Sequence, residues 1–137
     1  FEPYAEQISK IYQGNLNVLE EVINILFYIA EADGNVSKSE LKMIQKIAKI
    51  FGLNQVQFNS IKETRKSSGK LNPYVVLESK PEDDLKIIRQ RYLKLSKEHH
   101  PDILMSKGVP EEVIAESKKT MRAINSAWDQ VQKLKTN

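Results

Sequence analysis

The stretch of sequence that decides the fold is residues 85–102, LKIIRQRYLKLSKEHHPD. Apolar residues recur in it every three or four positions, as on one face of an α-helix. They are Leu85, Ile88, Tyr92 and Leu95. The far face is cationic and carries Lys86, Arg89, Lys94 and Lys97. Pro101 ends such a helix and disfavours helical backbone at His100. We therefore expect His100 and Asp102 on a loop, with free side chains, at the end of a basic amphipathic helix.

The composition indicates a folded chain of one domain or two small ones. The 137 residues are 40% hydrophobic, which argues against wholesale disorder. There is no cysteine, so disulfides and thiolate metal sites are excluded, as suits the cytosol. The net charge of +3 suits an acidic protein surface, a membrane surface or nucleic acid. No apolar run reaches about 18 residues, so we expect no membrane span here. The start at Phe1 suggests a piece of a longer protein.

The first half of the chain predicts four helices, over about residues 3–13, 16–32, 37–51 and 55–66. The second is apolar on nearly all sides, so we expect it to be buried at the centre of a first domain. Asn15 or Asn17 can cap it, Ser37 and Glu40 match a capping box, and Asn54 can cap the fourth helix. The expected inward residues include Ile8 and Ile11 in the first helix and Val56, Phe58 and Ile61 in the fourth.

Residues 66–70, KSSGK, predict a linker, and we place the domain boundary there. A short helix should begin at Pro73. The basic helix has three candidate N-caps, Ser79, Asp83 and Asp84. After Asp102 we expect a loop over residues 103–109 and a last helix from Pro110 to about Lys133. Its inner stripe is Met121, Ile124, Trp128 and Val131. The two long helices should form an antiparallel hairpin with His-Pro-Asp at its tip.

Two stretches carry a family resemblance. Residues 92–95, YLKL, followed by residues 99–102, HHPD, resemble helix II and the HPD loop of a J domain, the signature module of DnaJ-type co-chaperones. Residues 124–128, INSAW, are similar to that family's helix III. The histidine doublet and the loop at 107–110 most resemble the DjlA subfamily. Residues 30–34, AEADG, are similar to the TerB-like helical domain that precedes the J domain there. Leu93 and Ile103 depart from the family, which usually has basic residues at these places.

The resemblance implies an all-α protein with a TerB-like domain at residues 1–68 and a J domain at residues 71–137. It implies no enzyme and no cofactor, but a stress-response co-chaperone that stimulates the ATPase of a DnaK-type chaperone. The implied partner-binding residues are His100, Pro101, Asp102, Lys86, Arg89, Tyr92, Lys94 and Lys97. The first domain would meet a client or regulatory protein. The parent would act at the cytoplasmic face of the bacterial inner membrane, through an anchor missing from this chain.

Two alternatives to this function remain open. The basic face could contact phosphates in a nucleic-acid-binding module, although we expect no nucleic acid, or the chain could be a scaffold with a vestigial His-Pro-Asp. A metal site at His99, His100 and Asp102 is not expected, because the spacing is too tight for the side chains to converge. Asp33, Asn35, Ser37 and Glu40 do not have the spacing of an EF-hand calcium loop, and we predict a turn and a capping box there.

Overall fold

The computed structural model describes residues 2–32, 34–66 and 71–136. Its helices, in chain order, are α1 (Glu2–Ile11), α2 (Leu16–Glu31), α3 (Lys38–Ile50), α4 (Gln55–Thr64), α5 (Pro73–Val76), α6 (Leu85–His99), α7 (Pro101–Met105) and α8 (Glu111–Thr136). The described residues contain no strand, so the prediction of an all-α fold is confirmed. Asp33 and residues 67–70, which hold most of the predicted linker, lie outside the described residues. Among the described helices, none is both long and apolar enough to cross a membrane.

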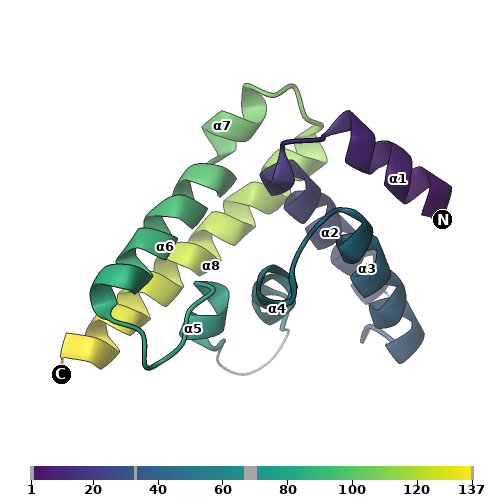
Figure 1. Ribbon diagram of the computed structural model, residues 1–137. Coiled ribbons are helices and arrows are strands. Elements are labelled where there is room, and N and C mark those ends of the chain that lie inside the picture. Colours follow the sequence, from purple (N-terminus) through teal and green to yellow (C-terminus); the bar gives the residue numbers. More distant parts are fainter. Residues whose placement is uncertain (1, 33, 67–70, 137) are drawn as a thin grey trace.

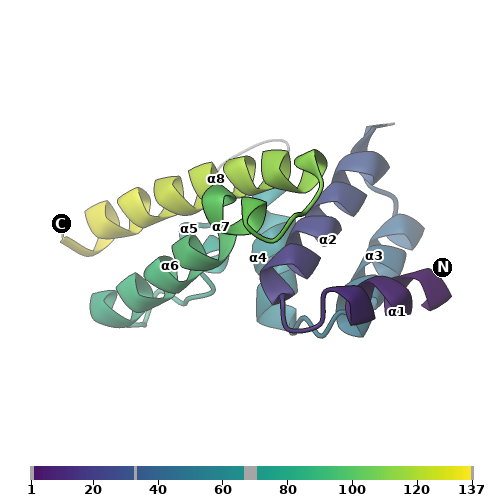
Figure 2. The same cartoon turned by 90° about the horizontal axis from the view of Figure 1, so that it is seen from above.

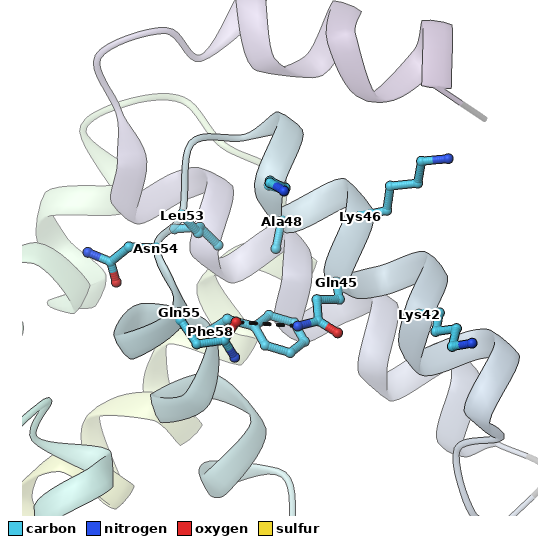
Figure 3. A pocket seen from close by; sticks show the side chains of 9 residues that line it. Lys42, Gln45, Lys46, Ala48, Leu53, Asn54, Gln55 and Phe58 are labelled. Atoms are coloured by element: carbon cyan, nitrogen blue, oxygen red, sulfur yellow. Dashed lines mark hydrogen bonds between the residues drawn. The ribbon is translucent and has the colours of Figure 1, made fainter.

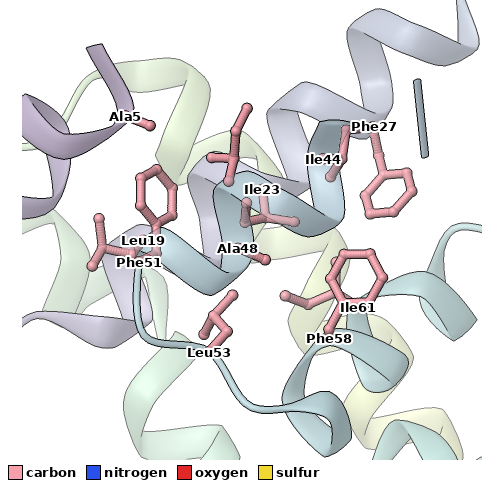
Figure 4. Packing of buried hydrophobic residues seen from close by; sticks show 11 residues of the cluster. Ala5, Leu19, Ile23, Phe27, Ile44, Ala48, Phe51, Leu53, Phe58 and Ile61 are labelled. Atoms are coloured by element: carbon pink, nitrogen blue, oxygen red, sulfur yellow. The ribbon is translucent and has the colours of Figure 1, made fainter. Parts of the chain in front are cut away.

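The first core is built by α1 to α4 (Figure 4). Ile23 and Ile44 are fully enclosed, and the rings of Phe27 and Phe58 lie 5.9 Å apart. The remaining buried members of this core are Ala5, Leu19, Ile47, Ala48, Phe51, Leu53 and Ile61. The apolar stripes of α3 and α4 therefore meet α2 as the periodicity predicts.

Three details of this half correct our expectations. Helix α2 is buried on most faces, as expected, but Ile29 and the neighbouring Tyr28 are 63% and 57% exposed. It packs against α3 with one face and α8 with another, which leaves a third face to solvent. Ile11 is 72% exposed because α1 turns Ala5 inward and Ile11 lies about 120° away around the helix. Val56, on the outer side of α4, is 51% exposed.

The predicted helix caps are present at α3 and α4. The Ser37 hydroxyl accepts from the Glu40 amide at 3.1 Å, and the Glu40 carboxylate accepts from the Ser37 amide at 3.0 Å. Asn54 caps α4 in the same reciprocal way with Gln57. Asn15 stands at the N-cap position of α2, but its side chain makes no capping bond. These local bonds fix where the two helices begin.

Helices α6 and α8 lie side by side and antiparallel, as Figures 1 and 2 show. The rings of Tyr92 and Trp128 stack with centroids 5.1 Å apart and planes 9° apart. The Tyr92 hydroxyl donates to the Asn125 side chain at 2.9 Å. The buried members of this second core are Val76, Leu77, Ile88, Leu95, Ile124, Ala127 and Val131. The predicted hairpin and its two facing stripes are therefore present.

The segment after the basic helix differs from our expectation. Residues 101–105 form the short helix α7 in place of a loop. Pro101 begins it, where a proline is well tolerated because the first amide of a helix needs no partner inside the helix. His100 is the N-cap, and its ring nitrogen Nδ1 accepts from the Asp102 amide at 3.2 Å. Leu104 is fully buried, which ties α7 to the hairpin.

Polar contacts join the two halves of the molecule. Arg65 donates to Glu31 at 3.1 and 2.9 Å and to Glu116, on α8, at 3.0 Å. The Ser60 hydroxyl donates to the Val76 carbonyl at 2.7 Å. Helix α2 also packs along α8, and α4 packs against α5. The hairpin is therefore packed against the first four helices (Figure 1).

Candidate partner-binding site

The His-Pro-Asp tripeptide lies on the surface where α6 meets α7. The side chains of His100 and Asp102 are 51% and 84% exposed, and Pro101 is half-buried. His100 Nδ1 lies 3.9 Å from the nearer Asp102 carboxylate oxygen. The backbone at His100 is extended, with φ −64° and ψ 128°, as expected before a proline. The Asp102 carboxylate is thus open to a partner and held by a short helix behind it.

The cationic face of α6 adjoins this tripeptide. The side chains of Lys86, Arg89, Lys94 and Lys97 are all exposed. Leu93, in the middle of that face, is 45% exposed. Lys94 lies 3.9 Å from Glu98, which is a weak contact at the surface. Tyr92 belongs mainly to the second core and brings its hydroxyl to the surface beside Asn125. The predicted basic residues therefore form one accessible strip that runs toward His-Pro-Asp.

A groove of about 470 Å³ lies beside the end of this strip. One wall comes from the hairpin and the other from the turn between α1 and α2. The groove is lined by Gly14, Leu16, Asn17, Lys94, Lys97, Glu98, Ile103 and Lys107. Sequence reasoning missed the first three and Lys107, since no local pattern indicates that residues about 80 positions apart share a surface.

His99, next to the exposed His100, points the other way and is buried between the two halves. Its Nε2 lies 2.9 Å from a Glu20 oxygen and its Nδ1 lies 2.7 Å from a Glu21 oxygen. Burial alone would lower the pKa of His99, but the hydrogen bonds to Glu20 and Glu21 outweigh it and raise the pKa to about 10. His99 is therefore a cation at neutral pH, held between two carboxylates.

Further carboxyl groups surround this histidine. Burial raises the pKa of Glu21 and of Glu98. Burial, together with repulsion from Glu20, raises the pKa of Glu78 to about 7. Glu78 also has a φ of +55°, a left-handed backbone that non-glycine residues seldom adopt. The contact region between the two halves of the molecule thus places several acidic groups around the buried cation His99.

The acidic groups around His99 include a possible set of metal ligands. Glu20, Glu98 and His99 can bring one ligand atom each to within 4.8 Å of the others. The set we considered from the sequence does not converge, because His99 points inward and His100 outward. Both ring nitrogens of His99 are already engaged by carboxylates, Nε2 by Glu20 and Nδ1 by Glu21. The cluster is best explained as a buried charge network.

A second groove, of about 570 Å³, lies between α3 and α4 on the first four helices (Figure 3). Phe58 and Leu53 form part of its floor, and Gln45 donates to Gln55 across it at 3.4 Å. Lys46, at its edge, pairs with Glu2 at 2.7 Å. This groove contains none of the partner-binding residues predicted from the sequence.

Comparison with known proteins finds one matching domain family and a group of distant relatives. Residues 1–63 match the family described as Tellurite resistance protein TerB. The Co-chaperone protein DjlA of Vibrio parahaemolyticus is 26% identical over 151 residues, which cover 89% of this chain and 53% of that protein. The DjlA proteins of Escherichia coli K12 and Vibrio vulnificus are each 25% identical, over 94% and 98% of this chain and 56% and 58% of those proteins.

The chain thus spans about half the length of the curated relatives it matches. No solved structure matches it significantly. The chain therefore carries a TerB domain at residues 1–63 and is distantly homologous, over most of its length, to the DjlA co-chaperones.

Proposed function

We propose that this chain is the part of a DnaJ-type co-chaperone that stimulates the ATPase of a DnaK-type chaperone. Residues 71–137 would be its J domain, following the TerB domain. The observation that carries the proposal is the exposed His-Pro-Asp at the end of a hairpin, beside an accessible cationic strip. The homology to proteins named co-chaperones supports the same role.

The tripeptide is suited to recognition rather than to chemistry. The exposed Asp102 carboxylate can accept a charge-assisted hydrogen bond from a partner arginine. Pro101 fixes the backbone, and the buried Leu104 anchors α7. Little conformational entropy is then lost when a partner binds, which favours affinity. ATP hydrolysis would take place on the chaperone, and this chain would act by binding.

The cationic strip would direct the encounter. Exposed lysines attract an acidic partner surface and set its orientation, with an effect that weakens as salt increases. The chain would act in the cytoplasm, where ATP and DnaK-type chaperones occur. The protein would act at the inner membrane, and its TerB domain would bind a client or regulatory protein.

The test is single-turnover ATP hydrolysis by a DnaK-type chaperone with and without this chain. We expect Asp102→Asn to reduce the stimulation by more than about tenfold, because the charge-assisted contact that the bound chaperone would bury is lost. Asp129→Asn, the same change at an exposed position on α8, is the matched control and should have no effect. Lys94→Ala with Lys97→Ala should raise the half-saturating chaperone concentration, most clearly at low salt.

Two results would contradict the proposal. One is an absence of stimulation by the unaltered chain. The other is full stimulation by Asp102→Asn, combined with weaker DNA binding and a flatter salt dependence in Lys94→Ala with Lys97→Ala. The second result would support the nucleic-acid-binding alternative.

A further inference from the structure

We propose that the TerB domain supplies one wall of the chaperone-docking surface, so that an acidic segment of the chaperone lies in the groove between the two domains. This inference rests on the proposed function and extends it. It concerns the groove of about 470 Å³ beside His-Pro-Asp. Leu16 and Asn17 line it from the TerB domain, and Lys97, Ile103 and Lys107 line it from the hairpin.

The two walls are held together by hydrogen bonds. The Asn17 side chain donates to the Glu98 carbonyl at 2.6 Å and accepts from the Lys107 ammonium at 3.2 Å. One turn further along α2, Glu20 holds the buried His99 at 2.9 Å. Asn17 is itself only 7% exposed. The groove is therefore a fixed feature of the molecule, whose walls do not depend on a partner to bring them together.

The chemistry of the groove suits an acidic protein segment. Lys94, Lys97 and Lys107 bring three positive charges, and Glu98 brings one opposing carboxyl group. Leu16 and Ile103 add apolar surface between the charges. An acidic segment with an apolar side chain would satisfy both kinds of contact. The described residues that line the groove include no aromatic ring or arginine for stacking on a base, which favours a protein over a single-stranded nucleic acid.

The groove is continuous with the tripeptide. Ile103 directly follows Asp102, and consecutive Cα atoms are about 3.8 Å apart. A chaperone whose arginine reaches Asp102 would therefore have its neighbouring surface over the groove. The TerB domain would contribute to affinity, while His-Pro-Asp would still trigger hydrolysis.

A pair of substitutions at Leu16 separates charge from packing. Leu16→Glu and Leu16→Lys both remove the same partly buried apolar side chain. Leu16 is the first residue of α2, where a negative side chain is favoured by the helix dipole and a positive one is not. Any weaker binding by the Glu variant thus cannot be caused by poorer folding than in the Lys variant. Ile11→Glu, at an exposed position on α1, is the control for added charge outside the groove.

The measurement is the chaperone concentration that half-saturates the stimulation of single-turnover ATP hydrolysis. We expect Leu16→Glu to raise it by about two- to fivefold over Leu16→Lys, which is the effect of one exposed charge interaction. The maximum stimulation should not change, and the difference should shrink at high salt. Ile11→Glu should behave as the unaltered chain.

The outcomes distinguish this inference from the function on which it rests. If the unaltered chain does not stimulate the chaperone, both are wrong. If Asp102→Asn abolishes the stimulation but the two Leu16 variants behave alike, the proposed function stands and the inference is overturned. The inference is also overturned if Leu16→Glu weakens the binding of a single-stranded DNA 20-mer and leaves chaperone binding unchanged.

Discussion

Replacing His99 with Gln should destabilise the whole molecule, because His99 is the cation between two buried carboxylates. Glu20 and Glu21 are 3% and 0% exposed. Without His99 they would face each other with no positive charge between them. Removing one partner of a buried ion pair costs about 3–5 kcal/mol.

The pKa of His99 provides a second measure of this cost. Its rise from 6.5 to about 10 corresponds to a stabilisation on the order of 5 kcal/mol. The raised pKa of Glu21 shows that its burial offsets part of the gain. We therefore expect His99→Gln to lower the free energy of unfolding by about 3 kcal/mol at pH 7.

The stabilisation that His99 provides should decrease as the pH rises. Because the pKa is higher in the folded state than in the unfolded state, the stabilisation is complete below about pH 6.5 and is lost as the pH rises to about 10. The difference between the unaltered chain and His99→Gln should therefore shrink from pH 7 to pH 10. Adding Glu20→Gln and Glu21→Gln to the variant should restore most of the stability at pH 7.

Urea unfolding can test this with two signals. Circular dichroism follows all helices, and the fluorescence of Trp128 follows the second core. Coincident curves would indicate one cooperative transition across both halves. A loss of less than about 1 kcal/mol at pH 7, or a loss that does not change with pH, would refute the account of His99 as a buried cation.

Three further predictions concern other parts of the molecule. Glu78→Gln should stabilise the protein at pH 8 by about 1–3 kcal/mol and have little effect at pH 4.5, because the cost of burying Glu78 grows from pH 4.5, its unfolded pKa, and is complete above its folded pKa of about 7; equal melting shifts at both pH values would contradict this. Ser37→Ala should cost about 0.5–2 kcal/mol in urea unfolding through loss of the α3 cap, and an unchanged midpoint would argue against it. Leu104→Ala should cost about 2–5 kcal/mol and reduce chaperone stimulation by loosening α7, so full stimulation by a destabilised variant would show that α7 does not hold His-Pro-Asp in place.

Much of the fold was predictable because its signals are local. The 3.6-residue period identifies the inner stripes of α6 and α8 without knowledge of their partners. Ser37 and Asn54 begin helices through bonds to amides three residues away. Pro101 ends α6 by its own ring geometry. We expected a loop where α7 lies, because the sequence does not show that the proline that ends one helix also begins another.

The site was predictable only in part. The sequence by itself determined that a basic helix ends at an exposed His-Pro-Asp, since helix period and proline stereochemistry act within a few residues. Only the tertiary structure decided that His99 is buried and charged while His100 faces solvent, because this depends on Glu20 and Glu21 from a distant helix. The groove with Asn17 likewise joins residues about 80 positions apart. Burial and electrostatic environment are properties of the packed molecule, and no sequence period encodes them.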